Sequence, residues 1–280
     1  MLSSCGAKPI SIPEKPEKQA ESEPKIEEPS IEKPHIHAKA EQFLLKMPTR
    51  SECGEIKLVC PSCGEEVGTR EFSFSDTVIV AGEDTPSGFE YSKKGVDVSH
   101  YQGKVDWKSL EGQIDFAYIK ATEGKTSVDS KFAQNLKALN ESPISFGAYH
   151  FFSFEASGEK QAENFIRNVP KLENMLPPAV DVELYGKYKN GENADFDKIR
   201  SELRIFADKL SEYYETAPVI YVSEKSYETI VSGYFDDCKI WTRSTGGETP
   251  VENWEFLQYS SSHLLICGNS KIPIDADLKK

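Results

Sequence analysis

Two carboxylic acids placed two positions apart are the residues of this chain best suited to acid–base chemistry. Asp181 and Glu183 end the apolar run 179–183, whose composition is typical of a short buried strand. The period of two in a strand puts both acids on one face, and Val180 and Val182 on the face toward the helices. Repulsion between the two carboxyls and partial burial raise the pKa of one of them. The pair therefore predicts a proton donor near neutral pH.

Acids and aromatic residues also stand in or at the ends of other predicted strands. We expect strands at 95–99, 116–120, 145–152, 179–183, 218–222, 239–242, 256–259 and about 265–275. Helical patterns at 129–140, 158–168, 195–214 and 224–231 lie between several of them. This alternation predicts an α/β barrel, in which the active site gathers at the carboxyl ends of the strands.

Five segments around these residues resemble, in order and spacing, glycoside hydrolase family 25, the Chalaropsis-type lysozymes (N-acetylmuramidases). They are Gly-Val-Asp-Val-Ser-His-Tyr-Gln-Gly-Lys-Val-Asp-Trp at 95–107, Phe-Ala-Tyr-Ile-Lys-Ala-Thr-Glu-Gly at 116–124, Gly-Ala-Tyr-His-Phe at 147–151, Asp-Val-Glu at 181–183, and Trp241 with Leu-Gln-Tyr-Ser at 257–260. Each motif alone is weak, but the combination is specific and covers about 185 of the 280 residues.

The resemblance implies a modified TIM-like (β/α)5(β)3 barrel that hydrolyses the β-1,4 bond between N-acetylmuramic acid and N-acetylglucosamine in peptidoglycan. Glu183 matches the general acid, and Asp181 matches the partner that orients the 2-acetamido group of the sugar in substrate-assisted, retaining chemistry. Asp97 and Asp275 match the two further acidic positions, although Asp277 leaves the register of the last one open. An oxocarbenium-like transition state needs this combination of an acid and nearby negative charge. No cofactor is implied.

Aromatic side chains with a polar tip suit the binding of sugar rings. We expect substrate contacts from Tyr149, Tyr221, Trp241, Tyr259, Glu123 and Tyr101. For Glu123 the alternative is an ion pair with Lys120 or Lys125.

Residues 1–40 have a composition unlike that of the rest of the chain. They contain six prolines, six lysines and seven glutamates but no aromatic residue, so we expect a disordered tether. Leu2-Ser3-Ser4-Cys5-Gly6 resembles a bacterial lipobox, which makes Cys5 a candidate lipid anchor. The basic and apolar regions of a signal peptide do not precede it, and the alternative is a chance cysteine.

A small β-rich segment is expected at 41–92, before the barrel at 93–280. Its Cys60-Pro61-Ser62-Cys63-Gly64 has the spacing of half a zinc site, and Cys53 is the nearest further thiol. A structural zinc ion, a disulfide-braced segment and free thiols remain open as alternatives.

Charge and hydropathy argue against two further classes of function, the binding of nucleic acid and the spanning of a membrane. The net charge of −13, from 33 basic and 46 acidic residues, argues against a nucleic-acid partner. No apolar stretch approaches about 18 residues, which excludes a membrane-spanning helix. We therefore expect a monomeric, secreted or cell-envelope protein that acts on peptidoglycan, anchored as a lipoprotein if Cys5 is modified. The alternatives are an inactive wall-binding module and a zinc-knuckle interaction protein that uses the barrel as a scaffold.

Overall fold

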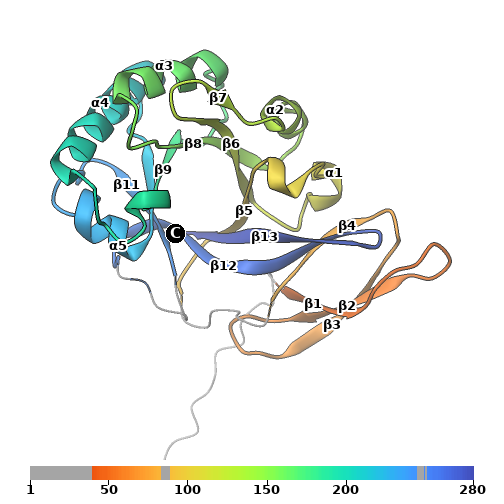
Figure 1. Ribbon diagram of the computed structural model, residues 1–280. Coiled ribbons are helices and arrows are strands. Elements are labelled where there is room, and N and C mark those ends of the chain that lie inside the picture. The colour runs from red at the N-terminus through yellow and green to blue at the C-terminus, as the bar shows by residue number, and fades with distance from the viewer. Residues whose placement is uncertain (1–39, 83–88, 245–248, 250) are drawn as a thin grey trace, which may run out of the picture. The chain divides into compact units, whose positions relative to one another are not determined.

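Eight strands form a closed barrel in the computed structural model, which describes residues 40–82, 89–244, 249 and 251–280 (Figure 1). In order around the barrel they are β5 (Lys93–Val98), β6 (Phe116–Glu123), β8 (Ser145–Phe151), β9 (Ala179–Val182), β10 (Val219–Val222), β11 (Lys239–Arg243), β12 (Trp254–Cys267) and β13 (Ser270–Lys279). Neighbours from β5 to β12 are parallel, and β13 closes the ring antiparallel to both β12 and β5. The predicted α/β barrel is confirmed.

Cys5 and nearly all of the predicted tether lie outside the described residues.

Helices follow the early strands and lie on the outside of the barrel (Figure 1). The helical and short elements are η1 (His100–Gln102), α1 (Trp107–Leu110), the short strand β7 (Ser127–Val128), α2 (Phe132–Asn140), α3 (Gly158–Asn168), η2 (Gly186–Tyr188), α4 (Phe196–Tyr214), α5 (Glu224–Ser226) and the π-helical turn η3 (Tyr227–Val231). Capping side chains fix where α3 and α4 begin. The side chain of Ser157 accepts a hydrogen bond from Lys160 N, and that of Asp195 accepts one from Lys198 N. The helices expected at 129–140, 158–168 and 195–214 form within three residues of those limits, and the segment expected as one helix at 224–231 consists of α5 and the π-helical turn η3. No helix among the described residues is long and apolar enough to cross a bilayer.

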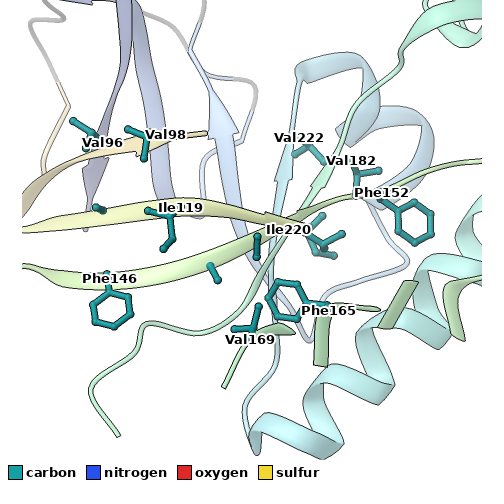
Figure 2. Packing of buried hydrophobic residues seen from close by; sticks show 14 of the residues in the cluster. Val96, Val98, Ile119, Phe146, Phe152, Phe165, Val169, Val182, Ile220 and Val222 are labelled. Carbon is teal, nitrogen blue, oxygen red and sulfur yellow. The ribbon is translucent and has the colours of Figure 1, made fainter. Parts of the chain in front are cut away.

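The strands divide their side chains between two apolar layers. The outer layer packs under the helices and contains Val180 and Val182, as the sequence predicts, together with the residues drawn in Figure 2. The inner aromatic cluster fills the barrel, and it consists of Phe116, Tyr118, Ala179, Val219, Tyr221, Trp241 and Phe256. Because this cluster occupies the interior, a ligand site can form only at an end of the barrel.

Two glycines make room for the inner aromatic cluster. A Cβ atom at Gly95 would lie 2.5 Å from the ring of Phe116, and one at Gly147 would lie 2.3 Å from the ring of Tyr118. Tyr118 in turn stacks on Trp241, with ring centroids 4.9 Å apart. The glycines therefore set how closely these rings approach the neighbouring strands.

The last two strands are longer than predicted, and they form one hairpin. β12 continues through Cys267, and the chain turns at Gly268, where φ is 58°. The polar residues 260–263 read as a loop in the sequence, but they belong to β12, where the register with β13 shifts at Gln258/Ser260 and Ser260/His263. Ser260 Oγ accepts from Ser262 N, so part of the hydrogen bonding lost at these bulges is recovered locally. The predicted strand at 265–275 is therefore wrong in its limits.

Residues 41–80 add four strands outside the barrel. β1 (Glu41–Lys46), β2 (Gly54–Val59) and β3 (Glu66–Phe72) form an antiparallel sheet, and β4 (Thr77–Val80) pairs antiparallel with β12. Ile56, Phe72, Val78, Val80 and Ile266 form a shared apolar cluster. The barrel and this segment lie in one compact unit, His37–Lys280. The division at 92/93 stays a prediction.

The predicted zinc site at Cys53, Cys60 and Cys63 is wrong. Cys53 precedes the six-residue strand β2 and Cys60 follows it, so about 20 Å of extended chain separates them. Among the described residues no group of three or more His, Cys, Asp or Glu side chains could hold a metal ion. Cys53 and Cys63 form no disulfide bond, so a brace of the segment through either of these two thiols is not present. The zinc-knuckle interaction protein thereby loses its structural basis.

A buried histidine joins β6, β8 and the start of α3. Gln161 Nε2 donates to the backbone oxygens of Ser153 and Ala156, so its Oε1 accepts from His150 Nε2 at 3.1 Å. His150 Nδ1 then accepts from Thr122 Oγ1 at 2.7 Å. Burial lowers the pKa of His150 from 6.5 to about 4, which keeps the ring neutral at physiological pH.

The buried histidine makes folding stability depend on pH. The unfolded chain protonates His150 near pH 6.5 and the folded chain only near pH 4, so its contribution is complete above pH 6.5 and is lost as pH falls toward 4. Between pH 7 and 5 we expect the free energy of unfolding of the wild type to fall by about 2 kcal/mol more than that of His150→Gln. Urea denaturation at both pH values measures this difference, and equal changes in the two proteins would contradict it.

Candidate active site

A cleft of about 310 Å³ lies at the carboxyl ends of the parallel barrel strands. Its lining consists of Asp97, Ser99, Tyr101, Gln102, Lys120, Tyr149, Phe151, Asp181, Glu183, Tyr221, Trp241, Arg243, Gln258 and Asp275. All four acids predicted to be catalytic are in this set, although they come from positions far apart in the chain. Four of the six predicted substrate contacts are also present, namely Tyr101, Tyr149, Tyr221 and Trp241.

The four acids form two pairs on opposite walls of the cleft. Asp97 on β5 and Asp275 on β13 are Cα partners across an antiparallel pairing. Asp181 lies on β9 and Glu183 directly follows that strand. β9 is three strands from β5 and four from β13 around the eight-stranded ring. A substrate in the cleft would therefore lie between two pairs of carboxyl groups.

Burial and like-charge repulsion raise the pKa values of these acids. Burial raises the pKa of Asp97, and repulsion from Asp275 adds to that rise. Burial raises the pKa of Asp275 to about 6, against the opposing charge of Arg243. The pKa of Asp181 rises well above its usual range, through burial and then repulsion from Glu183. Burial also raises the pKa of Glu183, again opposed by Arg243. The cluster thus holds protons at a pH where exposed carboxyls are ionised.

One oxygen of Asp181 has no hydrogen-bond partner in the described part of the chain. Its Oδ1 is buried at the cleft and accepts no hydrogen bond there. A buried oxygen without a hydrogen-bond donor destabilises the folded state, because it has lost its hydrogen bonds to water and gained none in return. A ligand that carries an N–H or O–H group at this point would supply one.

A hydrogen-bonded side chain holds Asp97 in place. Gln258 Nε2 donates to Asp97 Oδ2 at 2.7 Å, and Gln258 Oε1 accepts from the hydroxyl of Tyr221 at 2.9 Å. Lower in the barrel, Trp241 Nε1 donates to Asp277 Oδ1 at 2.9 Å, and Asp277 is fully buried. Of the two aspartates whose register was open, Asp275 therefore lines the cleft and Asp277 lies under it.

Two predicted substrate contacts are not in the cleft. Gln258 points into it, and because neighbouring strand residues face opposite sides, Tyr259 points away. The hydroxyl of Tyr259 lies 3.2 Å from His263 Nε2 beside a separate small cavity. Glu123 does not line the cleft, and its Oε2 accepts from Lys120 Nζ at 2.7 Å, which is the ion-pair alternative. Tyr259 therefore lies outside the lining of the cleft.

Sequence reasoning predicted no substrate contact for two cations of the cleft lining. Lys120 lies on β6, with its Nζ 4.9 Å from the ring centroid of Phe151, and Arg243 is the last residue of β11. The available signal was their position toward the ends of predicted strands. A single lysine or arginine at a strand end belongs to no recognisable motif. Its place in the cleft follows only from the closed barrel, which brings the other lining residues next to it.

Comparisons with known proteins agree with this geometry. A sequence model of "Glycosyl hydrolases family 25" matches residues 96–266. The chain is 31% identical over 179 residues to "Uncharacterized protein YegX" of Escherichia coli (strain K12), covering 61% of this chain and 64% of that protein. It is 29% identical to "Lysozyme M1" of Streptomyces globisporus, covering 60% and 62%. The match therefore spans less than two thirds of each of these two relatives.

A solved structure is similar over more of the chain. It is a family 25 glycosyl hydrolase from Bacillus anthracis, 35% identical, with a TM-score of 0.65 over 71% of this chain and 94% of that one.

The burial of Asp275, with repulsion from Glu183 as a smaller contribution, predicts that removing this acid stabilises the fold. The pKa of Asp275 is near 3.8 in the unfolded chain and about 6 in the folded one, so ionisation of this carboxyl destabilises the folded state above pH 6. We expect Asp275→Asn to raise the free energy of unfolding by about 1–2 kcal/mol at pH 7.5, and the gain to vanish near pH 4.

Asp237 provides a control of opposite sign. The guanidinium of Arg204 lowers the pKa of Asp237, so Asp237→Asn should not stabilise the fold at pH 7.5. Urea denaturation at pH 7.5 and 4 compares the two variants. A loss of stability in Asp275→Asn at pH 7.5 would contradict the claim that ionisation of the buried Asp275 destabilises the fold.

Proposed function

Because the chain belongs to glycosyl hydrolases family 25, we propose that it hydrolyses the β-1,4 bonds between N-acetylmuramic acid and N-acetylglucosamine in peptidoglycan. The observation that carries this proposal is the meeting of Asp97, Asp181, Glu183 and Asp275 in one cleft. Cleavage of a glycosidic bond needs a proton donor at the leaving oxygen and negative charge near the anomeric carbon. Relatives called lysozyme, from Streptomyces globisporus and Clostridium acetobutylicum, support the same substrate.

Glu183 is the general acid in this proposal. It is half-buried at the end of β9, and burial raises its pKa, so the protonated form persists closer to neutral pH. It donates its proton to the glycosidic oxygen as the bond to the anomeric carbon breaks. Its position beside Asp181 separates the two roles, because repulsion disfavours simultaneous ionisation of both carboxyls.

Asp181 orients the 2-acetamido group of the sugar. The unpartnered Oδ1 would accept the acetamido N–H, which aims the acetamido carbonyl oxygen at the anomeric carbon. Attack by that oxygen forms a cyclic intermediate, and water then opens it with overall retention of configuration. Asp97 and Asp275 on the opposite wall together supply the negative charge that stabilises the oxocarbenium-like transition state, and this charge resides on Asp275, because its pKa is raised only to about 6 whereas burial raises the pKa of Asp97 to about 8. Gln258 keeps Asp97 in place for this role.

Aromatic residues of the cleft provide surfaces for the sugar rings. Tyr149, Tyr221 and Trp241 line its inner part, where Trp241 exposes only 2% of its surface. Tyr101 is 79% exposed at the rim, and its ring lies 4.1 Å from that of His100. His100 Nδ1 lies 2.7 Å from Asp129 Oδ2, so the platform under Tyr101 is fixed before a sugar binds.

A peptidoglycan substrate places the protein at the cell wall. We therefore propose a secreted or cell-envelope location. The lipid anchor at Cys5 and the monomeric state stay predictions from the sequence.

Substitution of the general acid tests the proposed function. We expect Glu183→Gln to lower the release of reducing ends from purified peptidoglycan at least about 100-fold, since the amide cannot donate a proton. In the wild type, activity should fall as pH rises past the raised pKa of Glu183, at a higher pH than an exposed glutamate would give.

Glu212→Gln serves as the matched control, because Glu212 is exposed on α4 outside the cleft lining, and it should keep full activity. If the wild type sediments with cell walls but releases no reducing ends, the protein is a wall-binding module and the proposed hydrolysis is wrong.

A further inference from the structure

Two cations stand on opposite walls of the cleft, between the two pairs of acids. Lys120 lies on β6 and Arg243 on β11, which are four strands apart in the ring of eight. The acid pairs lie on β9 and on β5 with β13, so the line that joins the cations crosses the line that joins the acids. If the acids flank the scissile bond, the glycan must run along the line of the cations. Lys120 and Arg243 then lie on either side of the bond that breaks.

The two cations differ in what they contact. Lys120 Nζ donates to Glu123 Oε2 at 2.7 Å and lies over the ring of Phe151, so its charge is already paired. Arg243 is exposed, and among the described residues its guanidinium has no ion pair and no hydrogen bond. Its charge reaches Glu183 and Asp275, since it opposes the rise in the pKa of both. Arg243 is therefore a cation near the acids whose planar donor group is left for a ligand.

We propose that Arg243 is a specificity-determining residue that binds a carboxylate on the muramyl side chain of the substrate. The inference rests on the proposed function and extends it to a group of the substrate that does not react. The flat guanidinium of arginine matches the two oxygens of a carboxylate and can donate to both. Two sources of this chemistry exist in peptidoglycan, namely the lactyl group of a muramyl residue without a peptide and the free acids of a stem peptide.

The negative charge of the protein explains why a contact between Arg243 and a substrate carboxylate would help binding. The chain carries a net charge of −13, and four of its acids lie in the cleft, so an anionic polymer is repelled at short range. Screening at physiological salt limits that repulsion to roughly 8 Å, which leaves local contacts to decide affinity. An exposed arginine beside the acids offsets the repulsion where the muramyl side chain would pass. It also favours a sugar with a carboxylate over an uncharged one of the same shape.

Binding without turnover tests the inference directly. In the Glu183→Gln background, calorimetry compares a muramyl tetrasaccharide that has free lactyl carboxylates with its methyl ester. We expect the acid to bind about 10-fold more tightly than the ester, the range of a charge-assisted hydrogen bond near the surface. Adding Arg243→Gln should abolish this preference, and Arg243→Lys should keep part of it. Arg167→Gln, which removes an exposed arginine of α3 outside the cleft lining, should leave the preference intact.

A second pair of probes separates the two sources of the carboxylate. If the lactyl acid and ester bind equally, a tetrasaccharide with stem peptides should bind about 10-fold more tightly than its amidated form, again only with Arg243 present. Either preference, lost in Arg243→Gln, supports the inference. It is overturned if Arg243→Gln weakens charged and uncharged probes alike, or if it changes none of them.

The proposed hydrolysis is judged separately, by the release of reducing ends with Glu183 in place. A wild type that shows the Arg243-dependent preference but no hydrolysis would overturn the proposed function alone.

Discussion

The burial of four neighbouring carboxyl groups at one end of the barrel is the constraint on which the rest of the structure depends. Asp97, Asp181, Glu183 and Asp275 line one cleft, where burial makes their ionisation unfavourable and repulsion adds to this for Asp97 and Asp181. Left to relax, such groups would move apart or draw in water. They stay together because each is on or next to a strand whose backbone is hydrogen bonded on both sides in a closed ring. The closed barrel thus maintains a local arrangement that is unfavourable by itself and useful for proton transfer.

The inner aromatic cluster determines where this arrangement can exist. Tyr118 and Trp241 stack inside the barrel, and the rings of Phe116 and Phe256 lie 5.5 Å apart beside them. These rings fill the interior, so the carboxyls meet at the surface of a packed layer and not in a channel. Trp241 belongs to both regions, since its indole N–H donates to the buried Asp277 while the ring lines the cleft. The base of the cleft is therefore set by core packing.

The sequence predicts the barrel strands and the four acids of the cleft. It does not predict the bulges of β12 or the cations that barrel closure places beside the acids. Short β-branched runs fix β9 and β10 to within a residue, and the period of two correctly separates Asp181 from Val180 and Val182. The bulges in β12 have no comparable signal, because a run of serines and a histidine reads as a loop until β13 pairs with it. Tyr259 lies outside the cleft lining for a different reason, because neighbouring residues of β12 face opposite sides and Gln258 faces inward. The place of Arg243 in the cleft had no sequence signal for another reason, since the acids near this isolated cation come from strands distant in sequence.

A chain of hydrogen bonds between the two walls shows why the geometry of the acids is not a local property. The hydroxyl of Tyr221 on β10 donates to Gln258 on β12, and Gln258 donates to Asp97 on β5. Tyr221 is also the Cα partner of Asp181 on β9. The separation of the acid pairs is thereby coupled to side chains of β10 and β12, neither of which carries a catalytic acid. Neutral groups can hold charged ones in this way without adding to their repulsion, which is why a glutamine suits the position better than a further acid or a cation.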